Sequence, residues 1–105
     1  LNQIDYLRDA AIQRFEFTIE LFWKVIKKIL LHEKIESSTP RDALSKAYQY
    51  ELVDNEGVWL SMLDDRNNTS HAYKEEEAKL IFEHIKTYLP IFLSTYNRLK
   101  DKYKL

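Results

Sequence analysis

The sequence contains no cysteine, one glycine and two prolines among its 105 residues. Without cysteine, the chain can form no disulfide, thiolate zinc site or cysteine nucleophile. The scarcity of glycine and proline argues against a β-rich fold, because tight turns depend on these residues. The three histidines, His32, His71 and His84, are far apart and match no histidine-based metal motif. We therefore expect no metal site and no cofactor.

Long apolar runs and an excess of positive charge are also missing. No apolar stretch reaches the roughly 18 residues of a membrane span, and residues 1–5 do not resemble a signal sequence. With 45% hydrophobic and 31% charged residues, we expect a soluble, cytoplasmic protein without membrane contact. The net charge of −1 differs from the basic excess of non-specific nucleic-acid binders. Any RNA contact must therefore be local or shared with a partner.

The length fits a single domain over residues 1–105, and residues 4–33 read as one long helix. Apolar residues recur there at spacings of three and four, namely Ile4, Leu7, Ala11, Phe15, Ile19, Phe22, Val25, Ile26 and Ile29. Ala10, Ile12, Leu21, Trp23 and Leu30 widen this stripe beyond half of the helix circumference. The width indicates burial on two sides, and we favour a homodimer over the central helix of a monomeric bundle.

Two shorter helices are expected next. Thr39 can cap a helix that begins at Pro40, with Asp42 in its first turn. Its inner face should carry Ala43, Leu44, Ala47 and Tyr48. Asp54 or Asn55 can cap a third helix, which should present Val58, Trp59, Met62 and Leu63 and end near Arg66, before a break over residues 67–70.

A long fourth helix follows the acidic residues 75–77, which suit a helix N-terminus. Its apolar face should carry Ala78, Ile81, Ile85, Tyr88, Leu89, Phe92, Tyr96 and Leu99, with a kink at Pro90. Four helices with short connections predict an all-α, four-helix up-and-down bundle.

The segment from Arg66 to Tyr73 concentrates residues that can carry chemistry. Arg66 continues the apolar face of the third helix and should point inward at its end. Its guanidinium suits phosphate, and His71 is the residue type that titrates near neutral pH. The segment could therefore bind a phosphodiester and move a proton beside it. The alternative is structural, with Arg66 paired to a carboxylate such as Glu16, Glu20, Asp64 or Asp65 and His71 merely solvated.

The order of these residues resembles a known family. Arg66, His71 and Tyr73 reproduce the Arg-x4-His-x-Tyr signature of HEPN proteins that are paired with minimal nucleotidyltransferases. The resemblance covers roughly residues 4–99 and includes residues 14–24, 39–44, 47, 58–59 and 64–67 in family order. The family is also described as nucleotidyltransferase substrate-binding proteins. One departure is Glu51, which stands where a glycine is expected before the third helix.

The resemblance implies a metal-independent endoribonuclease that works as a homodimer, a toxin with RNA as its substrate. Arg66 would bind the scissile phosphate and stabilise its developing charge, and His71 would act as general acid or base. Asn67 would orient the phosphate or hold His71. Tyr73 would be the residue that a cognate minimal nucleotidyltransferase, the antitoxin, adenylylates. The alternative that this family leaves open is a non-catalytic subunit that presents substrate to a two-component nucleotidyltransferase.

The aromatic residues and the lysines of the first helix admit two interpretations each. Phe15, Phe17, Phe22, Trp23 and Trp59 could stack on bases, but their helical spacing favours packing in the core or a dimer interface. Lys24, Lys27 and Lys28 form a small basic face. We interpret it as solvated, with partner docking or RNA approach as the less favoured alternative.

Overall fold

The computed structural model describes residues 3–70 and 74–103, which contain four α-helices and no strand. α1 spans Gln3–His32, α2 spans Pro40–Gln49, α3 spans Glu56–Thr69 and α4 spans Glu75–Tyr103. The prediction of an all-α bundle of four helices is confirmed.

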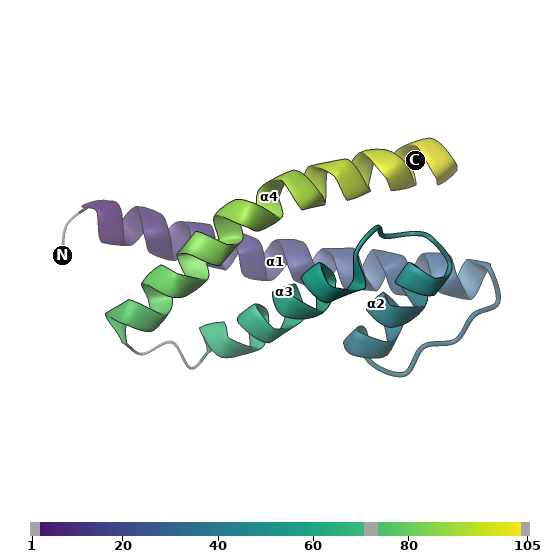
Figure 1. Ribbon diagram of the computed structural model, residues 1–105, viewed down its shortest axis with the longest axis horizontal. Helices are drawn as coiled ribbons and strands as arrows, with labels where there is room; N and C mark the ends of the chain where they lie inside the picture. Colours follow the sequence, from purple (N-terminus) through teal and green to yellow (C-terminus); the bar gives the residue numbers. More distant parts are fainter. Residues whose placement is uncertain (1–2, 71–73, 104–105) are drawn as a thin grey trace.

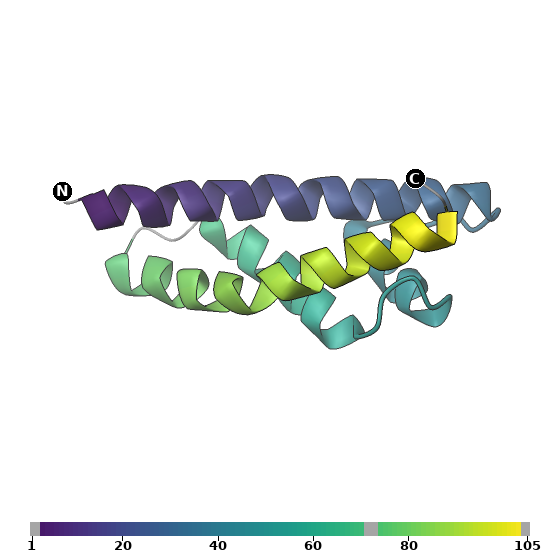
Figure 2. The same cartoon turned by 90° about the horizontal axis from the view of Figure 1, so that it is seen from above.

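α1 is the element on which the other three helices pack. Its 30 residues make a rod of about 45 Å, close to the 48 Å longest dimension of the molecule. α4 starts near the same end as α1 and crosses it diagonally, while α3 runs back towards that end (Figure 1, Figure 2). The end of α3 and the start of α4 therefore both lie near the N-terminal half of α1.

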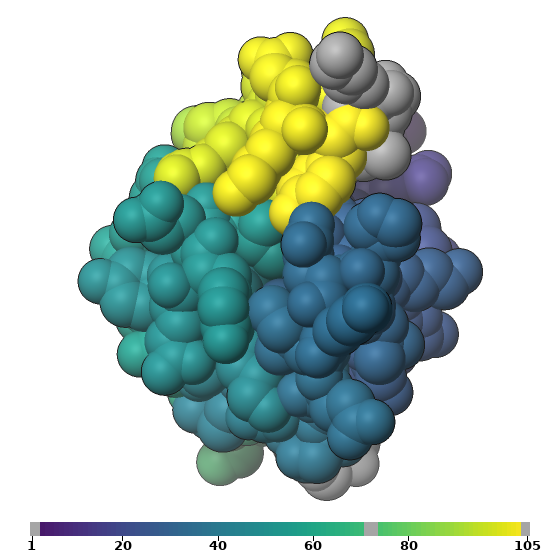
Figure 3. Space-filling view, turned by 90° about the vertical axis from the view of Figure 1, so that its right-hand side faces the viewer, coloured from purple at the N-terminus to yellow at the C-terminus, as the bar shows by residue number. Residues whose placement is uncertain are grey.

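α2 packs against α1 and α3 towards the other end of the molecule. In the space-filling view of that end, the teal residues lie beside the blue residues that precede them in the sequence, and the yellow end of α4 lies above both (Figure 3). The predicted start of α2 is confirmed, because the hydroxyl of Thr39 accepts a hydrogen bond from the Asp42 amide at 3.0 Å. Of the two candidate caps for α3, Asn55 is the one used, and its side-chain oxygen accepts from the Val58 amide at 3.2 Å.

α1 and α2 end in the same way, although neither has a glycine there. Lys34 and Glu51 both adopt a left-handed backbone with φ of 63°. The Ile35 amide donates to the Leu30 carbonyl at 2.8 Å, and the Leu52 amide donates to the Ala47 carbonyl at 2.7 Å. These are the hydrogen bonds of a Schellman motif, in which glycine is the usual left-handed residue. The geometry at Glu51 explains why a glycine is expected there.

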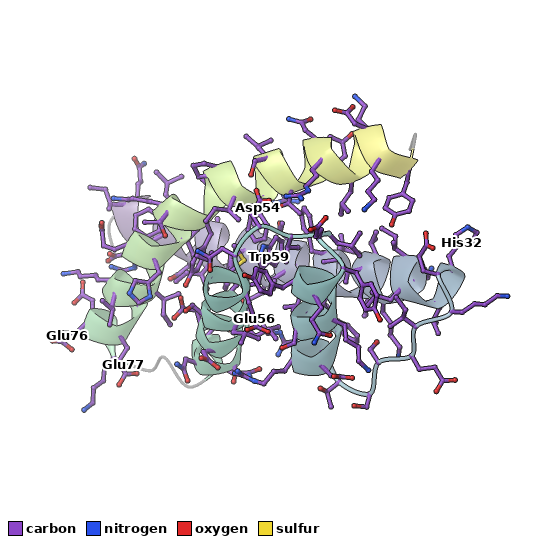
Figure 4. All side chains as sticks on the ribbon, turned by 45° about the vertical axis from the view of Figure 1, so that its right-hand side comes forward. His32, Asp54, Glu56, Trp59, Glu76 and Glu77 are labelled. Carbon is purple, nitrogen blue, oxygen red and sulfur yellow. The ribbon has the colours of Figure 1, made fainter. Side chains whose placement is uncertain are left out.

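The core is a cluster of aromatic rings contributed by α1, α3 and α4. Phe15, Phe22, Trp59, Tyr88 and Phe92 form ring pairs whose centroids are 5.2 to 6.3 Å apart. Trp59 is 1% exposed and lies among the helices in Figure 4. Burial of this cluster fixes the faces that the helices turn towards one another.

Some predicted positions were wrong. Tyr48, expected on the inner face of α2, is exposed, and so are Leu89 and Tyr96 of α4. They lie on sides of these helices that no other described helix covers. The fourth helix continues through Pro90, and its ribbon bends along its length (Figure 1). α3 continues to Thr69 rather than ending near Arg66, because contacts of its last turn hold that turn helical despite its polar sequence.

Candidate functional site

Arg66 lies in the last turns of α3 and pairs with a carboxylate of α1. Its Nε atom lies 3.3 Å from Oε2 of Glu20, in an ion pair whose two side chains are 40% and 32% exposed. The same Nε atom is buried, and no described residue accepts a well-directed hydrogen bond from it. The prediction that Arg66 points inward is therefore only partly right. Of the four carboxylates considered as its partner, Glu20 is the one that the structure supplies.

The end of α3 is tied to α1 by a second carboxylate. The Thr69 hydroxyl donates to Oε2 of Glu16 at 2.9 Å, one turn of α1 before Glu20. Across the junction, the guanidinium of Arg8 lies 3.9 Å from the Glu75 carboxylate at the start of α4. The two ends that flank residues 71–73 are thus both anchored on α1.

Arg66 and Asn67 line one groove of about 320 Å³ between α1, α2 and α3, together with Glu20, Trp23, Thr39, Pro40, Arg41 and Leu63. Asn67 is exposed there. Arg41 was not predicted as a site residue. Its guanidinium is held by Asp64 of α3 at 2.6 Å, and both side chains are more than half exposed. The groove therefore joins two arginines that are 25 residues apart in the sequence.

The other predicted site residues, His71 and Tyr73, lie outside the described residues. Their neighbours in the chain are described on both sides. Ser70 follows the last residue of α3 and Lys74 precedes the first residue of α4.

A buried carboxylate, Asp65, faces α4 from a different side of α3, and its burial was not predicted from the sequence. Asp65 is 8% exposed, and its Oδ2 accepts a hydrogen bond of 2.5 Å from the Tyr88 hydroxyl. Nδ1 of His84 lies 3.0 Å from the same oxygen and 3.2 Å from the other. Because an ionised carboxylate can only accept, Nδ1 carries the proton in this pair. The sequence signal is the position of Asp65, three residues after the buried Met62 and on the same helix face.

The hydroxyl of Tyr88 is kept protonated in this cluster. Burial, followed by the hydrogen bond to the Asp65 carboxylate, raises the pKa of Tyr88 well above its ordinary value. His84 lines two hollows on this side of the bundle, of about 610 Å³ and 420 Å³. The acidic residues Asp64, Asp65 and Glu77 also line these hollows, and the described lining residues include no arginine or lysine. This side of α3 is therefore unsuited to phosphate.

Membrane-spanning helices and metal clusters are both missing from the described part of the chain. None of the four helices combines the length and apolar character that crossing a membrane requires. Residues 3–70 and 74–103 also bring together no group of three or more histidine, aspartate or glutamate side chains fit to hold a metal ion.

The fold and groove define a small helical-bundle protein with an arginine-lined polar site. Comparisons with known proteins place it more narrowly. Residues 1–101 match the model of a family described as "nucleotidyltransferase substrate binding protein like". A curated relative, "Probable ribonuclease HepT" of Haemophilus influenzae, is 32% identical over an alignment of 106 positions, and the alignment covers 94% of this chain and 73% of the relative. A crystal structure of a protein from Thermus thermophilus matches with a TM-score of 0.85 and 34% identity, covering 94% of this chain and 84% of that one.

The chain therefore belongs to the HEPN-type nucleotidyltransferase substrate-binding protein family. The family predicted from the sequence is confirmed.

Proposed function

We propose that this protein is an HEPN-type toxin, a metal-independent endoribonuclease controlled by a partner minimal nucleotidyltransferase. The observation that carries the proposal is the placement of Arg66 and Asn67 in one groove at the end of α3, directly before the segment that contains His71. The relative named as a probable ribonuclease, 32% identical, supports the same class of activity.

In the proposed reaction, the 2′-oxygen of RNA forms a bond to phosphorus and the bond to the 5′-oxygen breaks. The products are a 2′,3′-cyclic phosphate and a 5′-hydroxyl. His71 accepts the proton of the attacking hydroxyl or supplies one to the leaving oxygen, and Arg66 stabilises the charge that develops on the phosphate. Asn67, in the same groove, orients the phosphate or holds His71. The ion pair of Arg66 with Glu20 is partly exposed, so phosphate can replace the carboxylate.

The proposed site is shared between two subunits, each of which supplies Arg66 and His71. Support comes from large apolar side chains that a single chain leaves exposed, among them Leu21 and Val25 of α1 and Leu93 and Tyr96 of α4. Leu21, Val25 and Tyr96 line one wholly apolar hollow, so the exposed surfaces of α1 and α4 adjoin. An exposed apolar surface of this kind is typical of an interface.

We further propose that the partner adenylylates Tyr73, which blocks the RNA site and adds negative charge beside Arg66.

The alternative function is a non-catalytic subunit that presents substrate to the nucleotidyltransferase. The ion pair between Arg66 and Glu20 favours this alternative. A catalytic Arg66 must leave Glu20 to bind phosphate, whereas a structural Arg66 keeps this partner.

The test is cleavage of RNA in the presence of EDTA, with analysis of the product ends. We expect cyclic phosphate ends from the unmodified protein, a loss of about 10²–10³-fold for Arg66→Ala and of about 10²–10⁴-fold for His71→Ala. His32→Ala and Arg14→Ala are matched controls, because both residues are exposed and neither lines the groove. Circular dichroism verifies that each variant is folded.

The proposal of catalysis would be overturned if the folded, unmodified dimer cleaved none of several RNAs. That outcome favours the substrate-binding alternative.

The role of Tyr73 is tested separately, by incubation with the partner and ATP. Mass spectrometry should find added adenylyl groups on the intact protein and none on Tyr73→Phe, and modification of Tyr73→Phe to the same extent would refute the assignment.

A further inference from the structure

The groove that holds Arg66 also contains an aromatic side chain. Trp23 of α1 packs partly against the core and lines the groove with its remaining surface. The sequence favoured packing for the five aromatic residues 15, 17, 22, 23 and 59. Trp23 alone of these five lines the groove. A tryptophan face beside a phosphate-binding arginine is an arrangement that accepts an unpaired base.

The groove also concentrates two arginines on a chain of net charge −1, each of them paired with one carboxylate. Its ionisable lining residues are Arg41, Arg66 and Glu20. Arg41 lies in the first turn of α2, two residues after the capping residue Thr39. The groove therefore offers two guanidinium groups on the α2 and α3 sides and the Trp23 ring on the α1 side.

We propose that this groove is a nucleotide subsite for single-stranded RNA, which rests on the proposed ribonuclease function. It takes the nucleotide next to the scissile phosphate, with the base stacked on Trp23 and the adjoining phosphate bound by Arg41. Arg66 remains on the scissile phosphate. A volume of about 320 Å³ is near the lower limit of small-ligand sites, so the groove has room for one nucleotide.

In the absence of RNA, both arginines are paired with carboxylates, Arg41 with Asp64 and Arg66 with Glu20. Both pairs are partly exposed, so little free energy is lost when a phosphate replaces the carboxylate. Glu20 lines the groove itself and repels phosphate there. Its removal should therefore strengthen RNA binding, whereas removal of Arg41 should weaken it.

The probe is a short single-stranded oligonucleotide with 2′-O-methyl sugars, which lacks the attacking hydroxyl and cannot be cleaved. The protein has two tryptophans, and only Trp23 lines the groove, since Trp59 is buried at 1% exposure. We expect the oligonucleotide to quench tryptophan fluorescence in the intact protein. Trp23→Phe, which retains only Trp59, should show almost no quenching.

Affinity provides the second measurement. Trp23→Leu should weaken binding about tenfold, and Trp23→Phe, which keeps an aromatic face, should weaken it less. An oligonucleotide with abasic positions should also bind the intact protein about tenfold less tightly. Arg41→Ala should reduce the slope of log affinity against log salt by about one. Glu20→Gln should tighten binding.

Two matched controls are available. Phe17 is an exposed aromatic residue of α1 that does not line the groove, so Phe17→Leu should leave affinity unchanged. Arg98 pairs with Asp54 as Arg41 pairs with Asp64, but it lies on α4, so Arg98→Ala should leave the salt slope unchanged. The conservative Trp23→Phe variant guards against a Trp23→Leu protein that fails to fold.

The outcomes separate this subsite from the proposed catalysis. Quenching by the oligonucleotide without cleavage of ordinary RNA supports the subsite and overturns the ribonuclease. Cleavage of RNA with undiminished affinity in folded Trp23 and Arg41 variants overturns the subsite and leaves the ribonuclease standing. Failure of the folded, unmodified protein to bind the oligonucleotide overturns the subsite.

Discussion

Asp65 and Arg66 are neighbours in the chain, but their side chains have partners on different helices. Arg66 pairs with Glu20 of α1, whereas Asp65 accepts hydrogen bonds from Tyr88 and His84 of α4. Consecutive residues of a helix are rotated by about 100°, so one turn can serve two neighbouring helices. The C-terminal part of α3 is thus fixed from both sides, and the α4 contacts include no residue that lines the groove of Arg66.

Loss of the Tyr88 hydroxyl should weaken this attachment. We expect Tyr88→Phe to lower the free energy of unfolding by about 1–2 kcal/mol, because the buried Asp65 carboxylate loses one of its donors. Urea unfolding measures the change. Tyr48→Phe is the matched control, since Tyr48 of α2 is 47% exposed and lies outside the apolar surface of α1 and α4, and it should stay within about 0.5 kcal/mol of the intact protein. Equal stabilities of the two variants would contradict the role of the hydrogen bond.

At the left-handed residue that ends α2, we expect a substitution to raise the free energy of unfolding. Glu51 has φ of 63°, a conformation that costs a residue with a side chain about 1–2 kcal/mol relative to glycine. After the extra chain entropy of glycine is subtracted, Glu51→Gly should raise the free energy of unfolding by about 0.5–1 kcal/mol. The matched control is Gln49→Gly, at the last helical residue of α2, which should lower stability. If Glu51→Gly is destabilising in thermal unfolding, the Schellman geometry at this position is wrong.

At the scale of elements, the stability of the start of α2 depends on the charge of the Asp42 carboxylate. Asp42 accepts hydrogen bonds from the Ser38 amide at 3.0 Å and from the Lys46 ammonium at 3.2 Å. The Ser38 amide first, and then Lys46, lower the pKa of Asp42 below its ordinary value of 3.8. A carboxylate with a lowered pKa stabilises the folded state above its unfolded pKa, and this stabilisation is lost as the pH falls through the folded pKa.

We therefore expect Asp42→Asn to lower Tm at neutral pH and to converge with the intact protein below about pH 3.8. Thermal melts followed by circular dichroism between pH 7 and pH 2.5 measure the difference. Asp101→Asn is the control, because Asp101 lies in the last turns of α4, where a negative charge opposes the helix dipole. A Tm difference for Asp42→Asn that stays constant over this range would contradict the contribution of the charge.

At the scale of the whole molecule, the bundle leaves part of α1 and α4 uncovered. Leu93 is 65% exposed on α4, near Tyr96 and the apolar hollow that Tyr96 shares with Leu21 and Val25 of α1. We expect this surface to be buried in a homodimer. Light scattering at micromolar concentration should give a dimer mass for the intact protein and a monomer mass for Leu93→Glu, because a charge at the centre of an apolar interface is costly.

Leu80→Glu is the matched control for this surface. Leu80 is 59% exposed on the same helix, but it lines the hollow with Asn68, Glu77 and His84. This variant should remain a dimer. A monomer mass for the intact protein would remove the shared-site arrangement from the proposed function, and monomers from both variants would place the interface elsewhere.

The sequence by itself determined the all-α class, four helices near their observed bounds, the cap at Thr39, two candidate caps for α3 and the family. These features depend on local chemistry, on apolar spacing within one helix, capping oxygens and the order of residues in motifs. The family order also drew attention to Arg66, and the sequence named Glu20 among its four possible partners. It could not choose between them, because the choice depends on how α3 packs against α1.

Only the tertiary structure decided which residues meet across helices. Arg41 and Trp23 share a groove with Arg66 because α1, α2 and α3 converge there, and no spacing in the sequence encodes this proximity. Asp65 lies on an apolar face where a charge is costly, and the donors that compensate it come from α4, 19 and 23 residues further along the chain. Local pattern specifies each helix and its faces, whereas the assignment of partners to a buried or half-buried charge requires the packed arrangement of all four helices.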